Sequence, residues 1–262
     1  MTASLSRERD NAAVWTSADL ASGPHADAAK AEKVRRMFAA IARRYDLNNT
    51  LHSFGRDAAW RRAAVRLAGV RDGDEVLDVA CGTGALTRAF ASARPAPARV
   101  VGADFTAEML DVARERPRDP RRRAAPIEYR LADAMALPFP DSSFDVVSIA
   151  FGIRNVADPA AVLREFRRVL RPGGRLVVLE FDRPRIAPIA WLNDLYTARV
   201  MPVSASLIAG DRSGAYRYLP RSVATFASRA EMARMLAASG FVSVAQTPLT
   251  FGVCVIHRAI AG

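Results

Sequence analysis

The sequence is poor in the side chains that form disulfides and metal sites. Among its 262 residues there are two cysteines, Cys81 and Cys254, and three histidines. Two cysteines cannot build a disulfide framework, and so few sulfur and imidazole ligands argue against a zinc site. We therefore expect a cytoplasmic protein that uses no metal.

Long apolar runs are also missing. No stretch reaches the roughly 18 apolar residues that a membrane-spanning helix needs. The first 30 residues have no apolar core and carry charges between Arg7 and Asp10, which does not match a secretory signal. We expect residues 1–30 to be a flexible extension. Because the chain has no internal repeat and its length suits one large α/β domain, we expect residues 31–262 to form a single domain.

Acidic residues are fewer than basic ones. The chain has 38 lysines and arginines against 27 aspartates and glutamates, which gives a formal charge of +11. Ten basic and three acidic residues fall within residues 30–66, and a second basic cluster lies at residues 118–123. Basic surface attracts an anionic membrane face or nucleic acid. The alternative is an arginine-rich but otherwise ordinary solvated surface.

Residues 76–84, Val-Leu-Asp-Val-Ala-Cys-Gly-Thr-Gly, are typical of a buried strand that ends in a glycine-rich turn. Asp78 lies inside the apolar run, where a carboxylate is costly unless it is hydrogen-bonded. A second apolar run ends at Asp104, 20 residues after Gly84. A glycine-rich turn followed at about this distance by an acid is the pattern with which α/β sheets hold a ribose.

The glycine spacing discriminates between ligands. A dinucleotide site would have a third glycine where this chain has Thr87. A nucleoside ligand without phosphates fits better, and S-adenosylmethionine is such a ligand. We predict that Asp78 and the backbone of Gly82–Gly84 hold its methionine part and that Asp104 accepts hydrogen bonds from both ribose hydroxyls.

Strand-like and helix-like segments alternate after residue 75. We predict helices at 84–93, 106–115, 159–170 and 229–239 between strands at 76–80, 99–104, 127–131, 144–151, 175–181, 241–247 and 251–258. This order indicates the α/β class, with a mostly parallel sheet covered by helices on both faces. Residues 116–126 are rich in proline and arginine and are expected to form an exposed loop.

Two segments fall outside this alternation. Helices at 31–45 and 57–67, separated by a break at Asn48-Asn49, are predicted to form a helical cap (31–68) over the ligand site. Residues 183–222 contain four prolines and follow the fifth strand. An excursion of this length indicates a lid that binds the acceptor.

Together with Asp133-Ala134, residues 137–139 and Arg171-Pro172-Gly173-Gly174, these features resemble the class I S-adenosylmethionine-dependent methyltransferases, which implies a Rossmann-like sheet of seven strands. Further stretches narrow the resemblance to the quinone-biosynthesis C-methyltransferase family. They are Phe38 with Tyr45-Asp46, Phe-Gly-Ile-Arg-Asn-Val at 151–156, Leu-Glu-Phe at 179–181, Tyr-Arg-Tyr-Leu at 216–219 and the tail from Leu249 to Arg258. The resemblance covers about residue 34 to the end. It implies methylation of a ring carbon of demethylmenaquinol or of a polyprenyl methoxy-benzoquinol.

The resemblance also implies which residues contact the cofactor. They are Thr83, Asp104, Asp133 and Ala134. We expect Asp133 to accept a hydrogen bond from the adenine amino group, and we assign Phe105 and Ala150 to the cofactor site as well. The chain departs from the family pattern at four of its positions. Ala150 replaces a common serine, which removes a hydroxyl contact; Asp133 replaces asparagine, Cys81 replaces glycine, and Gly210 in the lid replaces asparagine.

The expected chemistry is in-line transfer of a methyl group from a sulfonium to carbon. The ring carbon becomes nucleophilic when the adjacent quinol hydroxyl loses its proton. We expect Arg154, a permanent cation with forked donors, to stabilise the phenolate, and Asn155 to orient the same oxygen. The structural alternative for Arg154 is a salt bridge.

Other side chains are candidates for the acceptor site. Tyr45, Tyr216 and Tyr218 could bond the quinol oxygens or line the ring pocket, with aromatic core packing as the alternative. Glu180 follows an apolar run at the carboxyl end of a predicted strand, which faces the ligand crevice. His257 is a candidate base with a structural role as its alternative, and neither cysteine is assigned as a nucleophile.

The expected partner is a prenylated quinol, with demethylmenaquinol preferred and the benzoquinol as the alternative. The basic N-terminal helices and the apolar lid suit transient contact with the anionic inner face of a membrane. A homodimer is compatible with the sequence. Two rivals remain open: a nucleic-acid methyltransferase, opposed by the missing Asn/Asp-Pro-Pro-aromatic turn after Ala150 and the lack of an RNA-binding module, and a non-catalytic cofactor-binding protein, opposed by Asp78, Asp104 and Arg154.

Overall fold

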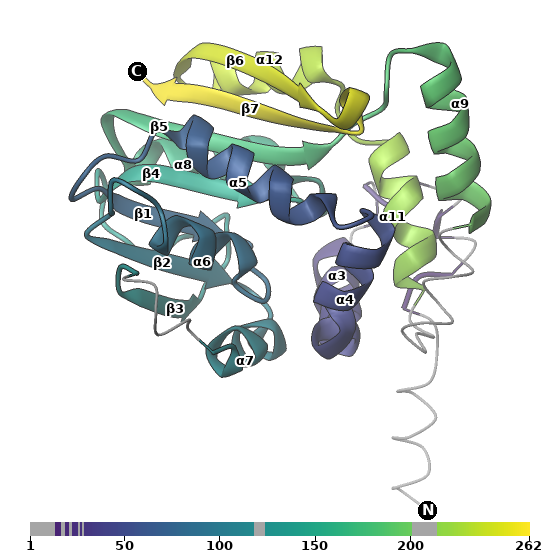
Figure 1. Cartoon of the computed structure of the whole chain (residues 1–262), viewed down its shortest axis with the longest axis horizontal. Helices are drawn as coiled ribbons and strands as arrows, with labels where there is room; N and C mark the ends of the chain where they lie inside the picture. Colours follow the sequence, from purple (N-terminus) through teal and green to yellow (C-terminus); the bar gives the residue numbers. More distant parts are fainter. Residues whose placement is uncertain are drawn as a thin grey trace, which may run out of the picture.

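A seven-stranded sheet in the order β3-β2-β1-β4-β5-β7-β6 forms the centre of the computed structural model (Figure 1). The structure describes residues 14–16, 19–20, 23–25, 27, 29–117, 124–200 and 214–262, apart from the side chains at positions 198 and 216. The strands are β1 (Glu75–Val79), β2 (Arg99–Asp104), β3 (Ile127–Leu131), β4 (Phe144–Ala150), β5 (Leu170–Phe181), β6 (Phe241–Leu249) and β7 (Cys254–Ala261).

The predicted mostly parallel sheet is confirmed. β1 pairs in parallel with both β2 and β4, and β2–β3 and β4–β5 are parallel as well. Only β7 runs the other way, because it enters antiparallel between β5 and β6. All five parallel strands therefore bring their carboxyl ends to one edge of the sheet, where α/β proteins place ligands.

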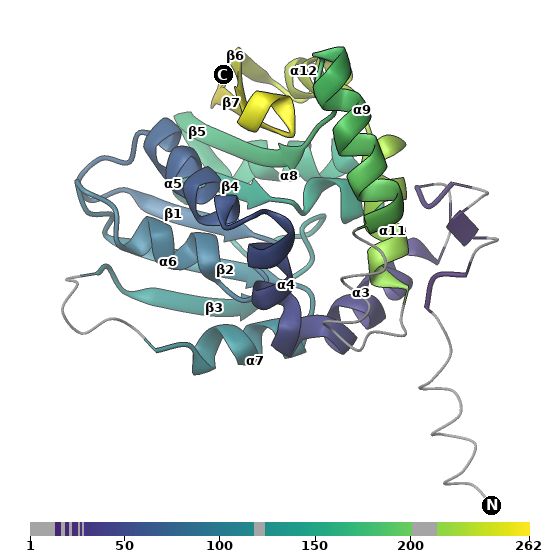
Figure 2. The same ribbon diagram turned by 45° about the vertical axis from the view of Figure 1, so that its right-hand side comes forward.

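Helices cover both faces of the sheet, as predicted. On one face lie α5 (Arg56–Ala68), α6 (Ala85–Ala91) and α7 (Ala107–Glu115); on the other lie α8 (Pro159–Val169) and α12 (Arg229–Ala238) (Figures 1 and 2). A hydrophobic cluster lies on each face of the sheet, and successive residues of β1 point into opposite clusters. Val76 packs with Trp60 of α5 on one face, and Leu77 packs with Phe166 of α8 on the other. Both clusters consist of apolar side chains that are almost fully buried.

The N-terminal helices differ from the prediction at one point. The chain forms α3 (Lys30–Ile41), a short turn η1 (Ala42–Arg44) and α4 (Tyr45–His52), so the helix is not broken at Asn48-Asn49. Asn48 is buried inside α4, where tertiary packing outweighs its low helix propensity. The break comes instead at Gly55, which has a φ of 71° and precedes α5.

Two other predicted boundaries are shifted. Arg171-Pro172-Gly173-Gly174 does end α8, but these residues lie within an irregular start of β5, opposite a register shift between Phe144 and Val146. The last strand begins at Cys254 rather than 251, because residues 250–252 form a short helical turn, η4 (Thr250–Gly252).

The lid segment contributes three described helical pieces after β5. They are α9 (Ala187–Leu195), η3 (Tyr196–Val200) and α11 (Ala215–Ala224), and Figure 2 shows α9 and α11 at the same end of the molecule as α3. Residues 201–213 of the lid, which include Gly210, and residues 118–123 of the predicted loop lie outside the described residues. No helix in the described ranges combines the length and hydropathy needed to cross a bilayer.

Trp15, which lies within the predicted extension at residues 1–30, packs against the rest of the protein. Its side chain is fully buried and stacks on Tyr218 of α11, with ring centroids 4.5 Å apart. Lys33 of α3 lies over the indole at 5.3 Å and pairs with Asp19 and Asp27 of the same segment. The charge pattern of the N-terminus suggested solvent, but it could not show that an aromatic partner about 200 residues away would cover this indole.

Candidate active site

The glycine loop after β1 lies against the third strand of the sheet. Gly84 has a φ of 74°, and a Cβ atom there would lie 2.3 Å from the Tyr129 hydroxyl oxygen. Glycine is therefore required at this position both by the backbone conformation and by the side chain below it. The sequence analysis missed Tyr129, because a tyrosine in a short strand carries no local signal of contact with a loop far away in the chain.

Asp78 lies beneath this loop on β1. Its carboxylate accepts hydrogen bonds from Thr87 Oγ1 and Ser148 Oγ, both at 2.7 Å, and its side chain is buried. Burial raises the pKa of Asp78 to about 6, and the two hydroxyl donors only partly offset this effect. The acid thus fixes β1 to α6 and β4 at the base of the loop.

Asp104 ends β2 and faces the glycine loop from the side. Its Oδ2 accepts from the backbone N–H of Gly82 at 2.8 Å, and its Oδ1 accepts from that of Thr106 at 2.9 Å. Burial raises the pKa of this carboxyl group, although the backbone donors favour the ionised form. Each carboxylate oxygen has a second lone-pair direction, so the group has capacity for further donors. Phe105 follows and joins the apolar cluster around Trp15.

The helical cap contacts the loop directly. Thr83, which is 1% exposed, donates from Oγ1 to Asp46 Oδ1 at 2.6 Å, and the other carboxylate oxygen of Asp46 pairs with Arg116 at 2.8 Å. The ring of Tyr45 approaches to 4.0 Å from where a Cβ of Gly82 would lie. The predicted cap thus covers this loop, and Tyr45 belongs to its inner surface.

The other predicted cofactor residues follow the same edge of the sheet. Asp133 and Ala134 come after β3, where Asp133 is exposed and its Oδ1 accepts from the Met135 N–H at 2.9 Å. The backbone N–H of Ala132 donates to the carbonyl of Asp104, which holds this turn beside the end of β2. Ala150 is the last residue of β4 and is half-buried.

The loop after β4 is pressed against the loop after β1. A Cβ on Gly152 would lie only 2.7 Å from the Cβ of Ala80, so the absence of a side chain permits this approach. Phe151, just before it, has a φ of 57°, a strained value for an aromatic residue. The close packing brings the short helical turn η2 (Ile153–Asn155) and its Arg154 to the edge of the sheet that carries Asp104.

Arg154 forms a buried ion pair with Glu180 at the end of β5. Arg154 Nη1 donates to Glu180 Oε1 at 2.5 Å and to the carbonyl of Phe151 at 2.8 Å. Both side chains are 5% exposed or less. Glu180 Oε1 also accepts from the Phe181 N–H, whereas Oε2 is buried without a hydrogen-bond partner among the described residues. Burial raises the pKa of Glu180, and the nearby guanidinium only partly opposes the shift.

Asn155 and Tyr218 form the adjoining part of this cluster. The Tyr218 hydroxyl donates to Asn155 Oδ1 at 3.0 Å, and Asn155 Nδ2 donates to the Phe151 carbonyl at 3.1 Å. Burial raises the pKa of Tyr218 to about 12, so its phenol remains a donor at neutral pH. The structure therefore brings together Arg154, Asn155, Tyr218 and Glu180. The side chain of Tyr216 is not among those described.

The N-terminal segment supplies two groups that sequence reasoning missed. Lys30 is buried, and its ammonium donates to the Val156 carbonyl at 2.6 Å and lies 3.1 Å from His25 Nδ1. His25 Nε2 lies 2.9 Å from the carbonyl of Ser222, whose hydroxyl accepts from Arg154 Nε. Burial, followed by the charge of Arg154, lowers the pKa of Lys30 to about 8. No local motif marks either residue.

The remaining candidates do not join this cluster. His257 is buried on β7 with its Nδ1 3.2 Å from Gln246 Nε2, and burial lowers its pKa to about 4. This arrangement matches the structural alternative for that residue. Burial also raises the pKa of both Cys81 and Cys254, which disfavours the thiolate. Within the described ranges, no group of three or more His, Cys, Asp or Glu side chains is arranged to hold a metal ion.

Comparison with known proteins covers nearly the whole chain. The sequence model of the ubiE/COQ5 methyltransferase family matches residues 26–261. A demethylmenaquinone methyltransferase of Thermus thermophilus is 49% identical over 221 residues, which are 84% of this chain and 98% of that protein. A ubiquinone/menaquinone biosynthesis C-methyltransferase UbiE of Ectopseudomonas mendocina is 43% identical over 231 residues, covering 88% of this chain and 90% of that protein.

Solved structures share the fold at low sequence identity. A methyltransferase solved in complex with the Trm112 activator of Haloferax volcanii superposes with a TM-score of 0.61 at 21% identity, covering 86% of this chain and 97% of that one. An S-adenosylmethionine-dependent methyltransferase of Thermotoga maritima superposes with a TM-score of 0.58 at 19% identity, covering 87% and 100%. At these identities the likeness concerns the fold alone.

Proposed function

This chain belongs to the ubiE/COQ5 methyltransferase family, and we propose that it methylates a ring carbon of a polyprenyl quinol, with demethylmenaquinol as the preferred acceptor. The name and near-complete coverage of the Thermus relative favour demethylmenaquinol. Relatives named for both quinones keep a methoxy-benzoquinol as the alternative. The observation that carries the proposal is the buried Arg154–Glu180 pair beside the glycine loop.

The residues at the carboxyl edge of the sheet fit S-adenosylmethionine. The loop at Gly82–Gly84 lets a ligand approach the backbone, and the Asp104 carboxylate retains acceptor capacity for ribose hydroxyls. Asp133 and Ala134 would bind the adenine, with Ala150 beside the site, and Thr83 would hold the cap over it. Asp78 acts from beneath the loop, through Thr87 and Ser148, rather than as a direct ligand. When bound, this cofactor supplies a methyl group activated by its sulfonium charge.

Glu180 and Arg154 have different roles at the quinol hydroxyl: Glu180 accepts its proton, and Arg154 stabilises the phenolate. Glu180 Oε2 is a buried carboxylate oxygen without a donor among the described residues, so a quinol hydroxyl that reaches it makes a hydrogen bond not otherwise formed there. Its raised pKa suits the acceptance of that proton. The guanidinium of Arg154 then stabilises the phenolate whose adjacent ring carbon is the nucleophile.

Asn155 and Tyr218 act as positioning groups for this pair. The Asn155 amide shares the Phe151 carbonyl with Arg154, and the Tyr218 hydroxyl fixes the orientation of that amide. Their buried positions also exclude water from the ion pair, which strengthens its field. We propose that Tyr45, on the inner side of the cap, forms part of the wall of the ring site. The role of Tyr216 stays a prediction.

The acceptor's polyprenyl tail requires a surface that meets a membrane. The cap and the lid contact each other and form a common surface. His52 Nδ1 lies 2.9 Å from the Tyr196 hydroxyl, and the rings of Phe54 and Tyr196 are 5.6 Å apart. We call it the apolar rim: Leu47, Leu51, Phe54, Ile186, Trp191, Leu192, Leu195 and Val200, all exposed. Exposed Arg56, Arg183 and Arg199 flank it. Such a surface suits peripheral contact with an anionic inner membrane face.

The proposal is tested by incubating the purified protein with methyl-labelled S-adenosylmethionine and a reduced short-chain quinol. Demethylmenaquinol and the demethylated methoxy-benzoquinol are supplied separately, and mass spectrometry follows the gain of one labelled methyl. Label on the naphthoquinol supports the preferred acceptor, and label on both supports a dual-pathway enzyme. Label on the benzoquinol alone shows that the methoxy-benzoquinol, and not demethylmenaquinol, is the acceptor. If the cofactor binds but neither quinol is labelled, the quinol assignment is wrong.

A further inference from the structure

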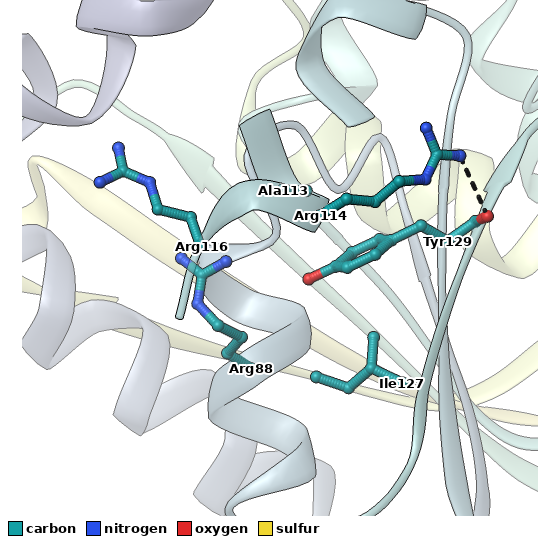
Figure 3. A pocket seen from close by; sticks show the side chains of 6 residues that line it. All are labelled: Arg88, Ala113, Arg114, Arg116, Ile127 and Tyr129. Atoms are coloured by element: carbon teal, nitrogen blue, oxygen red, sulfur yellow. Dashed lines mark hydrogen bonds between the residues drawn. The ribbon is translucent and has the colours of Figure 1, made fainter. Parts of the chain in front are cut away.

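A polar pocket lies next to the glycine loop, and neither Arg154 nor Glu180 lines it. It has a volume of about 220 Å³ and is lined by Arg88, Ala113, Arg114, Arg116, Ile127 and Tyr129. Arg88 comes from α6, the next three residues from the end of α7 and the segment after it, and the last two from β3. Figure 3 shows the Tyr129 side chain extending between the Arg114 and Ile127 side chains, with its hydroxyl toward Arg88 and Arg116.

The pocket is lined by three guanidinium groups, two of which are paired with carboxylates. Arg114 pairs with Asp111 at 3.0 Å and donates from Nη2 to the Tyr129 carbonyl at 3.4 Å, the dashed line in Figure 3. Arg116 pairs with Asp46 at 2.8 Å, and Arg88 has no carboxylate partner within the described part of the chain. Instead, Arg88 Nη1 donates to the carbonyl of Thr83 at 2.8 Å. Each guanidinium has five N–H donors, so three of them around one cavity provide far more donors than these contacts use.

Tyr129 adds a neutral donor at the floor of the pocket. Burial raises the pKa of its phenol, so it stays protonated at neutral pH and can donate to an anion. Forked guanidinium donors bind phosphate oxygens in a bidentate manner, and a phosphate group has enough oxygens to accept from more than one guanidinium. We infer that this pocket binds a phosphate group, either a free phosphate compound or a lipid headgroup.

The contacts of the pocket extend to the cofactor loop. Arg88 holds the carbonyl of Thr83, while Arg116 holds Asp46, which in turn accepts from the Thr83 hydroxyl. A phosphate dianion in the pocket competes with Asp46 for Arg116, because the existing pair is partly exposed and therefore weak. Occupation of the pocket thus loosens one of the contacts that hold the cap over the loop. This coupling rests on the proposed cofactor site, whereas phosphate binding itself does not.

The site is tested on the full chain by calorimetric titration with inorganic phosphate in the absence of cofactor. Arg114→Gln should weaken phosphate binding about tenfold, because it removes a charged donor. Tyr129→Phe should weaken binding less, because it removes a neutral donor and keeps the ring that lies under Gly84. Arg164→Gln is the matched control, since this exposed arginine lies on α8, on the opposite face of the sheet. Failure to detect saturable phosphate binding, or equal weakening in Arg114→Gln and Arg164→Gln, would overturn the assignment.

Two further arms separate the sources of the phosphate and test the coupling. Displacement of bound phosphate by phosphatidylglycerol mixed into phosphatidylcholine vesicles assigns a lipid headgroup, and retention of the phosphate assigns a soluble compound. Saturating phosphate should weaken S-adenosylhomocysteine binding severalfold in the wild type and not in Arg114→Gln. An unchanged affinity in the wild type, with phosphate bound, would overturn the coupling to the loop.

Discussion

Trp15 and Tyr218 are stacked with an interplanar angle of 25°, although they lie 203 positions apart in the chain. The same tyrosine donates to Asn155, which shares the Phe151 carbonyl with Arg154. The N-terminal segment is therefore a wall behind the proposed acceptor site. Its contribution to stability and to the position of Tyr218 can be measured directly.

Trp15→Ala should lower the free energy of unfolding by about 3 kcal/mol, because it removes a fully buried indole and leaves a cavity. Urea denaturation followed by circular dichroism measures this change. Trp191→Ala is the matched control, since Trp191 is 65% exposed and its loss should cost no more than about 0.5 kcal/mol. Similar losses in both variants would show that Trp15 is not packed as described.

Glu180→Gln should lower kcat about a hundredfold or more, because the amide keeps the shape of the side chain but cannot accept the quinol proton. The dissociation constant of S-adenosylmethionine should change less than about twofold. In the wild type, burial raises the pKa of Glu180, so the rate should rise as pH increases through that pKa, and this rise should vanish in the variant. Steady-state kinetics across pH, with a binding titration of the cofactor, gives all three quantities.

Glu165→Gln is the control for Glu180, since Glu165 also pairs with an arginine, Arg168, but lies on α8 away from the acceptor cluster. It should keep its kcat and its pH profile. An unchanged pH profile in Glu180→Gln would remove Glu180 from the proton transfer and leave Arg154 as an electrostatic group alone.

The free energy of unfolding of Asp78→Asn should increase relative to that of the wild type as the pH rises. Burial raises the pKa of Asp78 from 3.8 to about 6, so the folded state binds the proton more tightly than the unfolded state. The contribution of this residue to the free energy of unfolding therefore falls as pH increases from about 4 to about 6. Between these limits, the stability of Asp78→Asn relative to wild type should shift by about 3 kcal/mol in favour of the variant.

Chemical denaturation at a series of pH values checks this prediction. Asp111→Asn, which removes an exposed carboxylate from α7, is the control. A constant difference between Asp78→Asn and wild type across the range would contradict a raised pKa. If the variant gains stability but loses cofactor affinity, the buried acid is retained for binding at a cost in stability.

The apolar rim should determine membrane partition. Serine at both Trp191 and Leu192 should reduce sedimentation with anionic vesicles about tenfold, because two exposed apolar side chains would no longer enter the interface. Val242→Ser is the control, since Val242 is also exposed but lies on β6, outside the rim. If the rim variant and the wild type sediment equally with the vesicles, the apolar rim is not the surface that contacts the membrane.

Much of the fold was readable from local pattern. The run at 76–84, the acid at Asp104 and the alternation of strands with helices predicted the parallel sheet and the edge where we propose that the cofactor binds. These features depend on periodicity and on turn chemistry between near neighbours, which the sequence states directly. Arg154 and Asn155 were predicted differently, because their stretch resembles that of a known family. Asn48-Asn49 was misjudged because packing of α4 outweighs the propensity of two residues.

What the sequence by itself determined is the chemistry available near the strand ends: glycines for the loop after β1, an acid within β1 and another at the end of β2, and an arginine after β4. Only the tertiary structure decided which groups meet. Glu180 became the partner of Arg154, Tyr129 came to lie under Gly84, and Trp15 became the support of Tyr218. These pairs join residues 26 to 203 positions apart. These residues come into contact because the strands pair in the sheet and the cap, the lid and the N-terminal segment pack against it. No local sequence pattern shows which residues will meet in this way.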